Sequence, residues 1–229
     1  MVPPKTKKEA SLAAVLSTVL AAVVVGVVLG FVYQVRFIPT FVRTADAVAS
    51  PDSDGRPTFL LGIQSPGANL NRAMRQLSDS NSEESVVSLT AGDLNEIADE
   101  YLNLTLGKQQ ALSNSSEPTY AILPDTPNFN LVESKLQVLV PFDILFFGMK
   151  GEGFFVSIGE FVQKDGKPSF SVEESWINSA RMPAFAASFV VDRFTKAIGN
   201  MVEDSLLAKA WTNVDHIEID GNSMAITIR

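Results

Sequence analysis

The chain has 229 residues, 46% of them hydrophobic, and a formal net charge of −8 at neutral pH. The negative charge lies beyond Gln34, where 15 Lys and Arg stand against 25 Asp and Glu, a net charge of −10. An acidic surface argues against binding to nucleic acid and against broad adhesion to anionic lipid headgroups. Because the chain contains no cysteine, disulfides, thiolate metal sites and cysteine nucleophiles are excluded.

An uncharged stretch rich in Leu, Val and Ala runs from Ala10 to Val35. A helix of this length, rising about 1.5 Å per residue, matches the roughly 30 Å hydrocarbon core of a bilayer. The sequence therefore predicts a transmembrane helix over residues 10–35, preceded by a basic tail over residues 1–9.

A cleavable signal peptide is the main alternative to this anchor. Lysines precede the apolar stretch, and Ala47-Val48-Ala49 has the small-x-small pattern of a cleavage site. The stretch is longer than the roughly 7–15 apolar residues of a signal peptide, and the motif lies far beyond its end. We therefore expect the segment to be retained. Three lysines in the tail favour a cytoplasmic N-terminus and a periplasmic or extracellular domain, in a single-pass protein of a bacterial cell membrane.

Small residues recur every four positions along the predicted span and include Ala22, Gly26 and Gly30. They form one helical face on which another helix can approach closely. This pattern predicts a helix partner in a membrane complex. Ordinary span composition is the alternative, because small residues are frequent in membrane helices.

The segment over residues 36–57 is rich in Pro and turn-forming residues, and we interpret it as a tether. Residues 58–229 are predicted to form one extracytoplasmic domain. Its first half contains a short strand candidate and a helix over residues 68–77. A second helix is expected after Thr90, which can cap its first turn, and Asp93 adds negative charge there.

Strands dominate the second half of the domain. They are predicted over residues 129–139, 153–163 and 169–177, followed by a terminal hairpin over residues 216–228. Asp165-Gly166 suits a two-residue hairpin turn with positive φ. A long amphipathic helix is predicted from Met182 to about Ala210. Because strands and helices do not alternate, we predict an α+β fold in which a curved, mainly antiparallel sheet wraps this helix.

Apolar residues occupy both faces of the strand that follows Leu136. A strand of this kind must be covered on both faces, either by protein or by a ligand. Packing against the helices of the domain is one interpretation. The other is an apolar groove that binds a lipid or lipid-like chain, and its candidate residues are Phe142, Ile144, Phe146, Phe147, Phe154, Phe155 and Phe161.

No motif of a catalytic class is present. His216 is the only histidine, and the chain has no Gly-x-Ser-x-Gly elbow, no phosphate-binding loop and no His-Glu-x-x-His. The turn at residues 52–55 resembles a Ca²⁺ loop but lacks the later ligands. Glu173 and Glu174 are adjacent on a strand and point to opposite faces. We therefore expect a non-enzymatic protein without catalytic residues, metal or cofactor.

Several features follow one another beyond the predicted span: Ser88-Leu89-Thr90-x-x-Asp93-Leu94-Asn95, two-sided apolar strands, a crossing that ends at Pro183, and a terminal hairpin. This order resembles the YpmS-like family of membrane-anchored extracytoplasmic proteins over about residues 86–229. The resemblance implies a TULIP-like lipid-binding fold and no catalytic residues. We therefore expect membrane lipid as the ligand. The alternative function is an accessory or structural subunit of a larger membrane complex.

Overall fold

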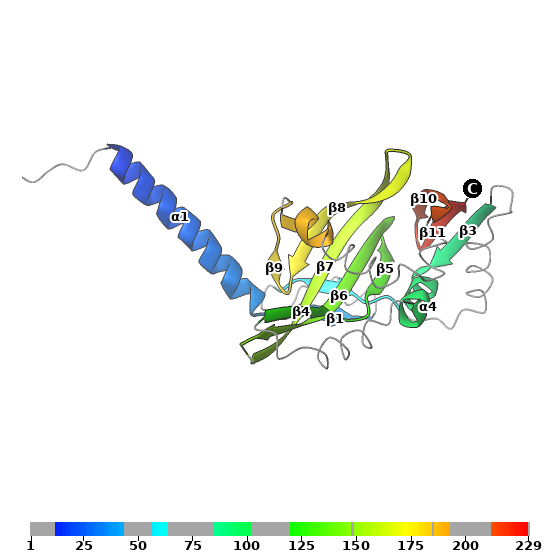
Figure 1. Ribbon diagram of the computed structural model, residues 1–229, viewed down its shortest axis with the longest axis horizontal. Coiled ribbons are helices and arrows are strands. Elements are labelled where there is room, and N and C mark those ends of the chain that lie inside the picture. The colour runs from blue at the N-terminus through cyan, green and yellow to red at the C-terminus, as the bar shows by residue number, and fades with distance from the viewer. Residues whose placement is uncertain are drawn as a thin grey trace, which may run out of the picture.

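The computed structural model describes residues 12–43, 56–63, 85–101, 120–147, 149–184, 186–192 and 212–228. The predicted basic tail and the predicted helix over residues 68–77 lie outside these ranges. Helix α1, Leu12–Val35, extends away from the strands as a separate rod (Figure 1). Its side chains are described for Ser17 and from Val19 onward.

The largest sheet has six strands, joined mainly by hairpins. Its order is β4-β6-β7-β8-β9, and β5 pairs with β6 beside β4; every pairing is antiparallel. The strands are β4 (Tyr120–Pro124), β5 (Asn128–Val132), β6 (Lys135–Phe146), β7 (Met149–Lys164), β8 (Lys167–Ile177) and β9 (Ala180–Arg181).

Tight turns explain these hairpins. Asp165 and Gly166 join β7 to β8 with φ of 53° and 74°, which confirms the predicted two-residue turn. Glu133 and Ser134 join β5 to β6 with φ of 51° and 61°, so the single strand predicted over residues 129–139 is two strands. Neither residue is Gly or Asn, and the pattern that announces such a turn is therefore absent from the sequence.

A second sheet of order β10-β11-β3 lies at the other end of the molecule, next to helix α4 (Figure 1). Its strands are β3 (Ser85–Thr90), β10 (Val214–Asp220) and β11 (Ser223–Ile228), and α4 covers Ala91–Tyr101. The predicted cap is confirmed, because Asp93 N–H donates to Thr90 Oγ1 at 3.3 Å and Thr90 N–H donates to Asp93 Oδ2 at 2.8 Å.

A short parallel pair, β1 (Thr40–Val42) and β2 (Thr58–Leu60), packs on the large sheet. Phe59 is 4% exposed and shares a core with Leu139 and Val156, and Phe41 packs against them. The structure thus places part of the predicted tether inside the folded domain. Only four residues separate the end of α1 from the start of β1.

The two faces of the large sheet are covered by different elements. On the face that we call the helix face, Val140, Phe142 and Phe155 pack against residues 186–191 and against Phe31 of α1. Further along that face, the sheet packs against α4 and the second sheet. The opposite face, which we call the β1–β2 face, is covered by β1 and β2. Protein therefore covers both faces of the central part of β6.

The predicted fold class was wrong. The described residues are mostly sheet and contain no long amphipathic helix with a sheet wrapped around it. Of the helix predicted from Met182 to about Ala210, residues 182–184 and 186–192 are described. Only residues 184 and 186–192 among them are helical, and they lie on one area of the helix face. Among the described residues, the second sheet and α4 pack on a further part of that face, where the prediction had placed the long helix.

The transmembrane part of the fold prediction is corrected as well. Within the described residues, no helix combines the length and the apolarity needed to cross a membrane. Helix α1 covers Leu12–Val35, and residues 10 and 11 of the predicted span lie outside the described ranges.

Candidate functional site

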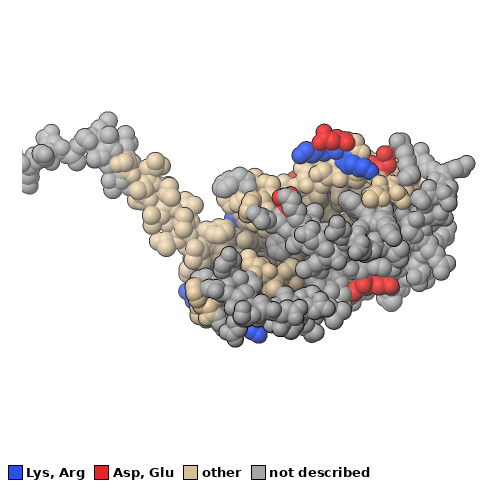
Figure 2. Space-filling model, in the orientation of Figure 1, with Lys and Arg blue, Asp and Glu red and all other residues tan. Residues whose placement is uncertain are grey.

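The surface of α1 is apolar on all sides and is largely uncovered by protein. Its described Val and Leu side chains between Val19 and Val32 are each 53–67% exposed. No charged residue occurs in the helix, and its described part shows neither blue nor red in Figure 2. Soluble domains rarely expose a continuous apolar surface of this size, so it marks an interaction with lipid or with protein.

The three predicted helix-packing residues lie on this surface. Ala22, Gly26 and Gly30 are all exposed. A Cβ added at Gly26 or Gly30 would meet no atom within 4 Å. Both glycines therefore leave space on the outside of α1, where a second helix could approach.

The end of α1 is fixed to the large sheet by Asn178, a buried residue that is 6% exposed. Its Nδ2 donates to the carbonyl of Val35 at 2.6 Å, and its Oδ1 accepts from Phe154 N–H at 2.8 Å. Asn178 has φ of 51°, a left-handed conformation that Asn tolerates better than most residues. Ser179 N–H also donates to the carbonyl of Phe37 at 3.0 Å.

Aromatic contacts add to this junction. Tyr33 and Phe37 meet edge to face with ring centroids 4.9 Å apart, and Arg56 lies over the Phe37 ring at 5.5 Å. Phe31 packs against the core of the helix face. The domain is therefore attached directly to the end of α1. Sequence reasoning missed Asn178, because a single Asn in a turn gives no signal of a contact 143 residues away.

The predicted lipid-binding residues are distributed over several places. Phe142 and Phe155 belong to the buried core of the helix face. Phe154 packs on the β1–β2 face against Phe41, with ring centroids 4.8 Å apart. Phe161 packs against Phe170 at the far end of the sheet.

The remaining lipid-binding candidates lie toward the tip of the β6–β7 hairpin. Ile144 is 37% exposed and Phe147 is 69% exposed. The side chain of Phe146 lies outside the described part. The structure therefore does not bring the seven residues together in one groove.

A hollow of about 360 Å³ opens next to two of these residues, Phe142 and Phe154. Its lining also contains three carboxylates, from Asp125, Asp143 and Glu152. This polar lining is unsuited to an acyl chain. Across the described ranges, no group of three or more His, Cys, Asp or Glu side chains is placed to hold a metal ion.

The charged groups that the sequence singled out form separate surface pairs. Glu173 accepts from Lys135 Nζ at 2.6 Å, and Glu174 accepts from Arg181 at 2.6 Å. The hydrogen bond from Lys135 to Glu173, together with their charge attraction, raises the pKa of Lys135 above its ordinary value of 10.5. His216 is exposed on β10, where Gln163 Nε2 lies 3.3 Å from its Nδ1. These contacts tie surface strands together rather than form an acid–base dyad.

Comparison with family models, with curated proteins and with solved structures finds no match for this chain. The resemblance to the YpmS-like family therefore stays a prediction.

Proposed function

We propose that the protein is a non-enzymatic, membrane-anchored protein whose α1 binds lipid through its apolar surface. The observation that carries this proposal is the uncharged surface of α1, whose described Val and Leu side chains between Val19 and Val32 are all more than half exposed. Each Leu or Val near the centre of an inserted helix favours insertion by about 0.3–0.6 kcal/mol, whereas an Arg opposes it by about 2.5–3.5 kcal/mol.

The β domain is proposed to lie directly on the membrane surface. Its support is the junction, where Asn178 and Ser179 bond to the backbone around the end of α1. The predicted orientation, with a cytoplasmic N-terminus and an extracytoplasmic domain, belongs to the same proposal. Cell-surface protease digestion of the full chain tests it, and protection of the domain in intact cells would contradict it.

Charge substitution in α1 tests membrane anchoring. In the full chain carrying Val24→Arg and Val25→Arg, we expect the membrane-bound fraction after carbonate extraction to fall strongly. The matched control is Val86→Arg, because Val86 is 64% exposed, similar to 54% and 56% for the two α1 valines, but lies on β3. The control should stay bound to the membrane. Equal retention of both variants would rule out α1 as the anchor.

The absence of catalysis is part of the proposal. It is supported by the composition of the chain, which has no cysteine and a single, exposed histidine. Assays of the full chain with ester, glycoside and peptide substrates test it. Reproducible turnover of any of these substrates would overturn it.

The small-residue side of α1, which contains Gly26 and Gly30, supports a second candidate function, that of an accessory subunit in a membrane complex. The specific observation is the open space at Gly26 and Gly30. Gly26→Leu and Gly30→Leu should each reduce co-purification of stoichiometric membrane partners while leaving membrane retention unchanged, because Leu separates two closely packed helices. Val27→Leu is the control, since Val27 is 67% exposed and already carries a branched side chain. Partner yields that match the wild type in both glycine variants would exclude this function.

A further inference from the structure

The β6–β7 hairpin exposes an unusual group of apolar side chains at its tip. Phe147 is 69% exposed and Met149 is 64% exposed. Ile122 on the adjacent strand β4 is 62% exposed and pairs with Ile144, which is 37% exposed. We call these four residues the apolar tip. Such a group adds little to the stability of the fold, because its side chains remain in contact with water.

The backbone at Phe147 makes this exposure more notable. Phe147 has φ of 47°, in the left-handed region where Gly, Asn and Asp are favoured. A bulky aromatic residue in this conformation is strained and gains little burial in return. The short turn between β6 and β7 explains the positive φ, but burial does not explain why this position holds a bulky apolar residue.

Strand register separates apolar from charged residues at this end of the sheet. Ile144 lies two positions after Phe142 on β6 and so points to the helix face. By cross-strand pairing, Ile122 and Met149 lie on the same face. No charged residue occurs among the described side chains of the helix face between residue 142 and the tip. The opposite face carries Asp143, Lys150 and Glu152.

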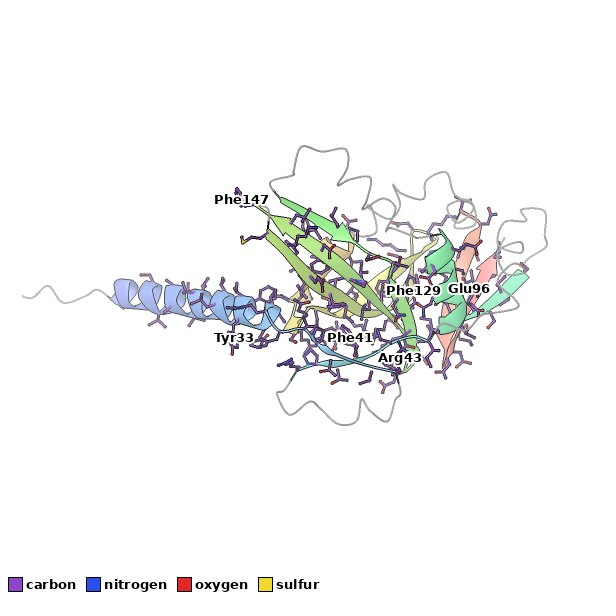
Figure 3. All side chains as sticks on the ribbon, turned by 90° about the horizontal axis from the view of Figure 1, so that it is seen from below. Tyr33, Phe41, Arg43, Glu96, Phe129 and Phe147 are labelled. Carbon is purple, nitrogen blue, oxygen red and sulfur yellow. The ribbon has the colours of Figure 1, made fainter. Side chains whose placement is uncertain are left out.

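The apolar face of the tip is continuous with the attachment of α1. Phe31 of α1 packs against the core that contains Phe142, and Ile144 follows Phe142 on that same face. Figure 3 shows Phe147 at the end of the domain from which α1 leaves, the end that also holds Tyr33. Because Asn178 bonds to the carbonyl of Val35, the end of α1 is held directly against the sheet. A membrane that surrounds α1 would therefore lie beside the tip.

We propose that the apolar tip inserts into the boundary between headgroups and acyl chains of the membrane that holds α1. This inference rests on the proposed membrane anchoring of α1. Lipid is the occupant that the geometry favours, because the tip lies beside the anchor and its carboxylates, Asp143 and Glu152, point to the opposite face and can remain in water. The domain then has two contacts with the membrane, which fix its orientation.

Single-cysteine labelling tests the proposal cleanly, because the native chain has no cysteine. A polarity-sensitive fluorophore is attached in turn to Phe147→Cys, Met149→Cys, Val25→Cys and Val86→Cys in the full chain. Each protein is reconstituted into vesicles of phosphatidylcholine and phosphatidylglycerol that contain a nitroxide lipid. We expect quenching at positions 147 and 149 to exceed that at position 86 by about threefold or more, since interfacial residues enter the bilayer by about 5–10 Å.

The outcomes separate the inference from the proposed function. If the nitroxide lipid quenches position 25 while positions 147 and 149 respond only to aqueous iodide, the tip inference is wrong and membrane anchoring stands. If position 25 is not quenched by lipid either, both proposals fail. If positions 147 and 149 are protected from both quenchers, protein covers the tip and the lipid proposal is overturned. Ile122→Cys provides a second probe with Phe147 and Met149 intact, and thermal unfolding of each variant verifies its fold.

Discussion

Helix α1 and strand β6 are both rich in apolar residues, yet α1 is exposed and β6 is largely buried. The described Val and Leu residues of α1 between Val19 and Val32 are exposed around the whole helix, whereas Leu139 and Val140 of β6 are 3% and 2% exposed. The difference is that other parts of the protein cover β6, with β1 and β2 on one face and residues 186–191 on the other. Similar apolarity therefore serves core packing in one segment and leaves an external surface in the other.

The contrast between β6 and α1 is tested most directly by placing the same charge in both segments. Val140→Asp buries an unpaired carboxylate in the core of the helix face, and we expect it to lower the free energy of unfolding by about 4 kcal/mol or more. Val25→Asp is the matched change, because Val25 is 56% exposed. It should leave thermal unfolding of the β domain unchanged and reduce only membrane retention. Equal destabilisation by both changes would show that α1 is part of the domain core.

Close backbone packing at Gly62, beside β5, predicts the next largest loss of stability. A Cβ added at Gly62 would overlap the carbonyl oxygen of Phe129 and lie 2.6 Å from Asn95 Nδ2. Gly62→Ala should therefore cost about 3 kcal/mol in chemical denaturation. Gly151, near the exposed tip, has no atom within 4 Å of an added Cβ, so Gly151→Ala should change stability by less than about 1 kcal/mol. A neutral Gly62→Ala would contradict the tight junction between β2 and β5.

The sequence predicted the local features that depend on neighbouring residues. The Thr90–Asp93 cap, the helix that follows it and the Asp165-Gly166 turn are confirmed, because each is decided within a few positions. The placement of β1 was not predictable in the same way. Strand β1 has only three residues, Thr40–Val42, and forms by pairing with β2. Its proline-rich flanks give no strand pattern in the sequence.

The fold class was missed for a related reason. Apolar periodicity shows that a strand face must be covered, but it does not identify the element that covers it. The helix predicted after Met182 and the second sheet are both apolar enough for this role, and the structure divides the helix face between them. For the candidate site, exposure at Phe147 and burial at Phe155 could not be distinguished, because both occur in similarly apolar stretches of the sequence.

The junction between the two regions offers a finer test. In Asn178→Asp, the side chain can still accept from Phe154 N–H, but it loses the donor to the Val35 carbonyl and places negative charge beside it. We expect a loss of about 1–3 kcal/mol in the free energy of unfolding. A broader distance distribution between spin labels on α1 and on the domain should accompany it. Asn222→Asp, in the exposed turn before β11, is the control and should change neither measurement.

The smallest effect is expected at the exposed start of β6, where Lys135 pairs with Glu173 at 2.6 Å. Exposed ion pairs contribute little to stability, so Lys135→Met should shift the melting temperature only slightly at neutral pH. The pKa of Lys135 is raised in the folded protein, mainly by its hydrogen bond to Glu173. The stabilisation is therefore fully present below the unfolded-state value of 10.5 and is lost as the pH rises through the higher folded-state pKa. Thermal unfolding of wild type, Lys135→Met, Glu173→Gln and the double variant at pH 7 and above pH 10.5 measures this coupling. A coupling energy that grows at the higher pH would contradict the assigned cause. A coupling energy as large as the loss of stability in Val140→Asp would show that burial by neighbouring elements does not distinguish Val140 from the exposed start of β6.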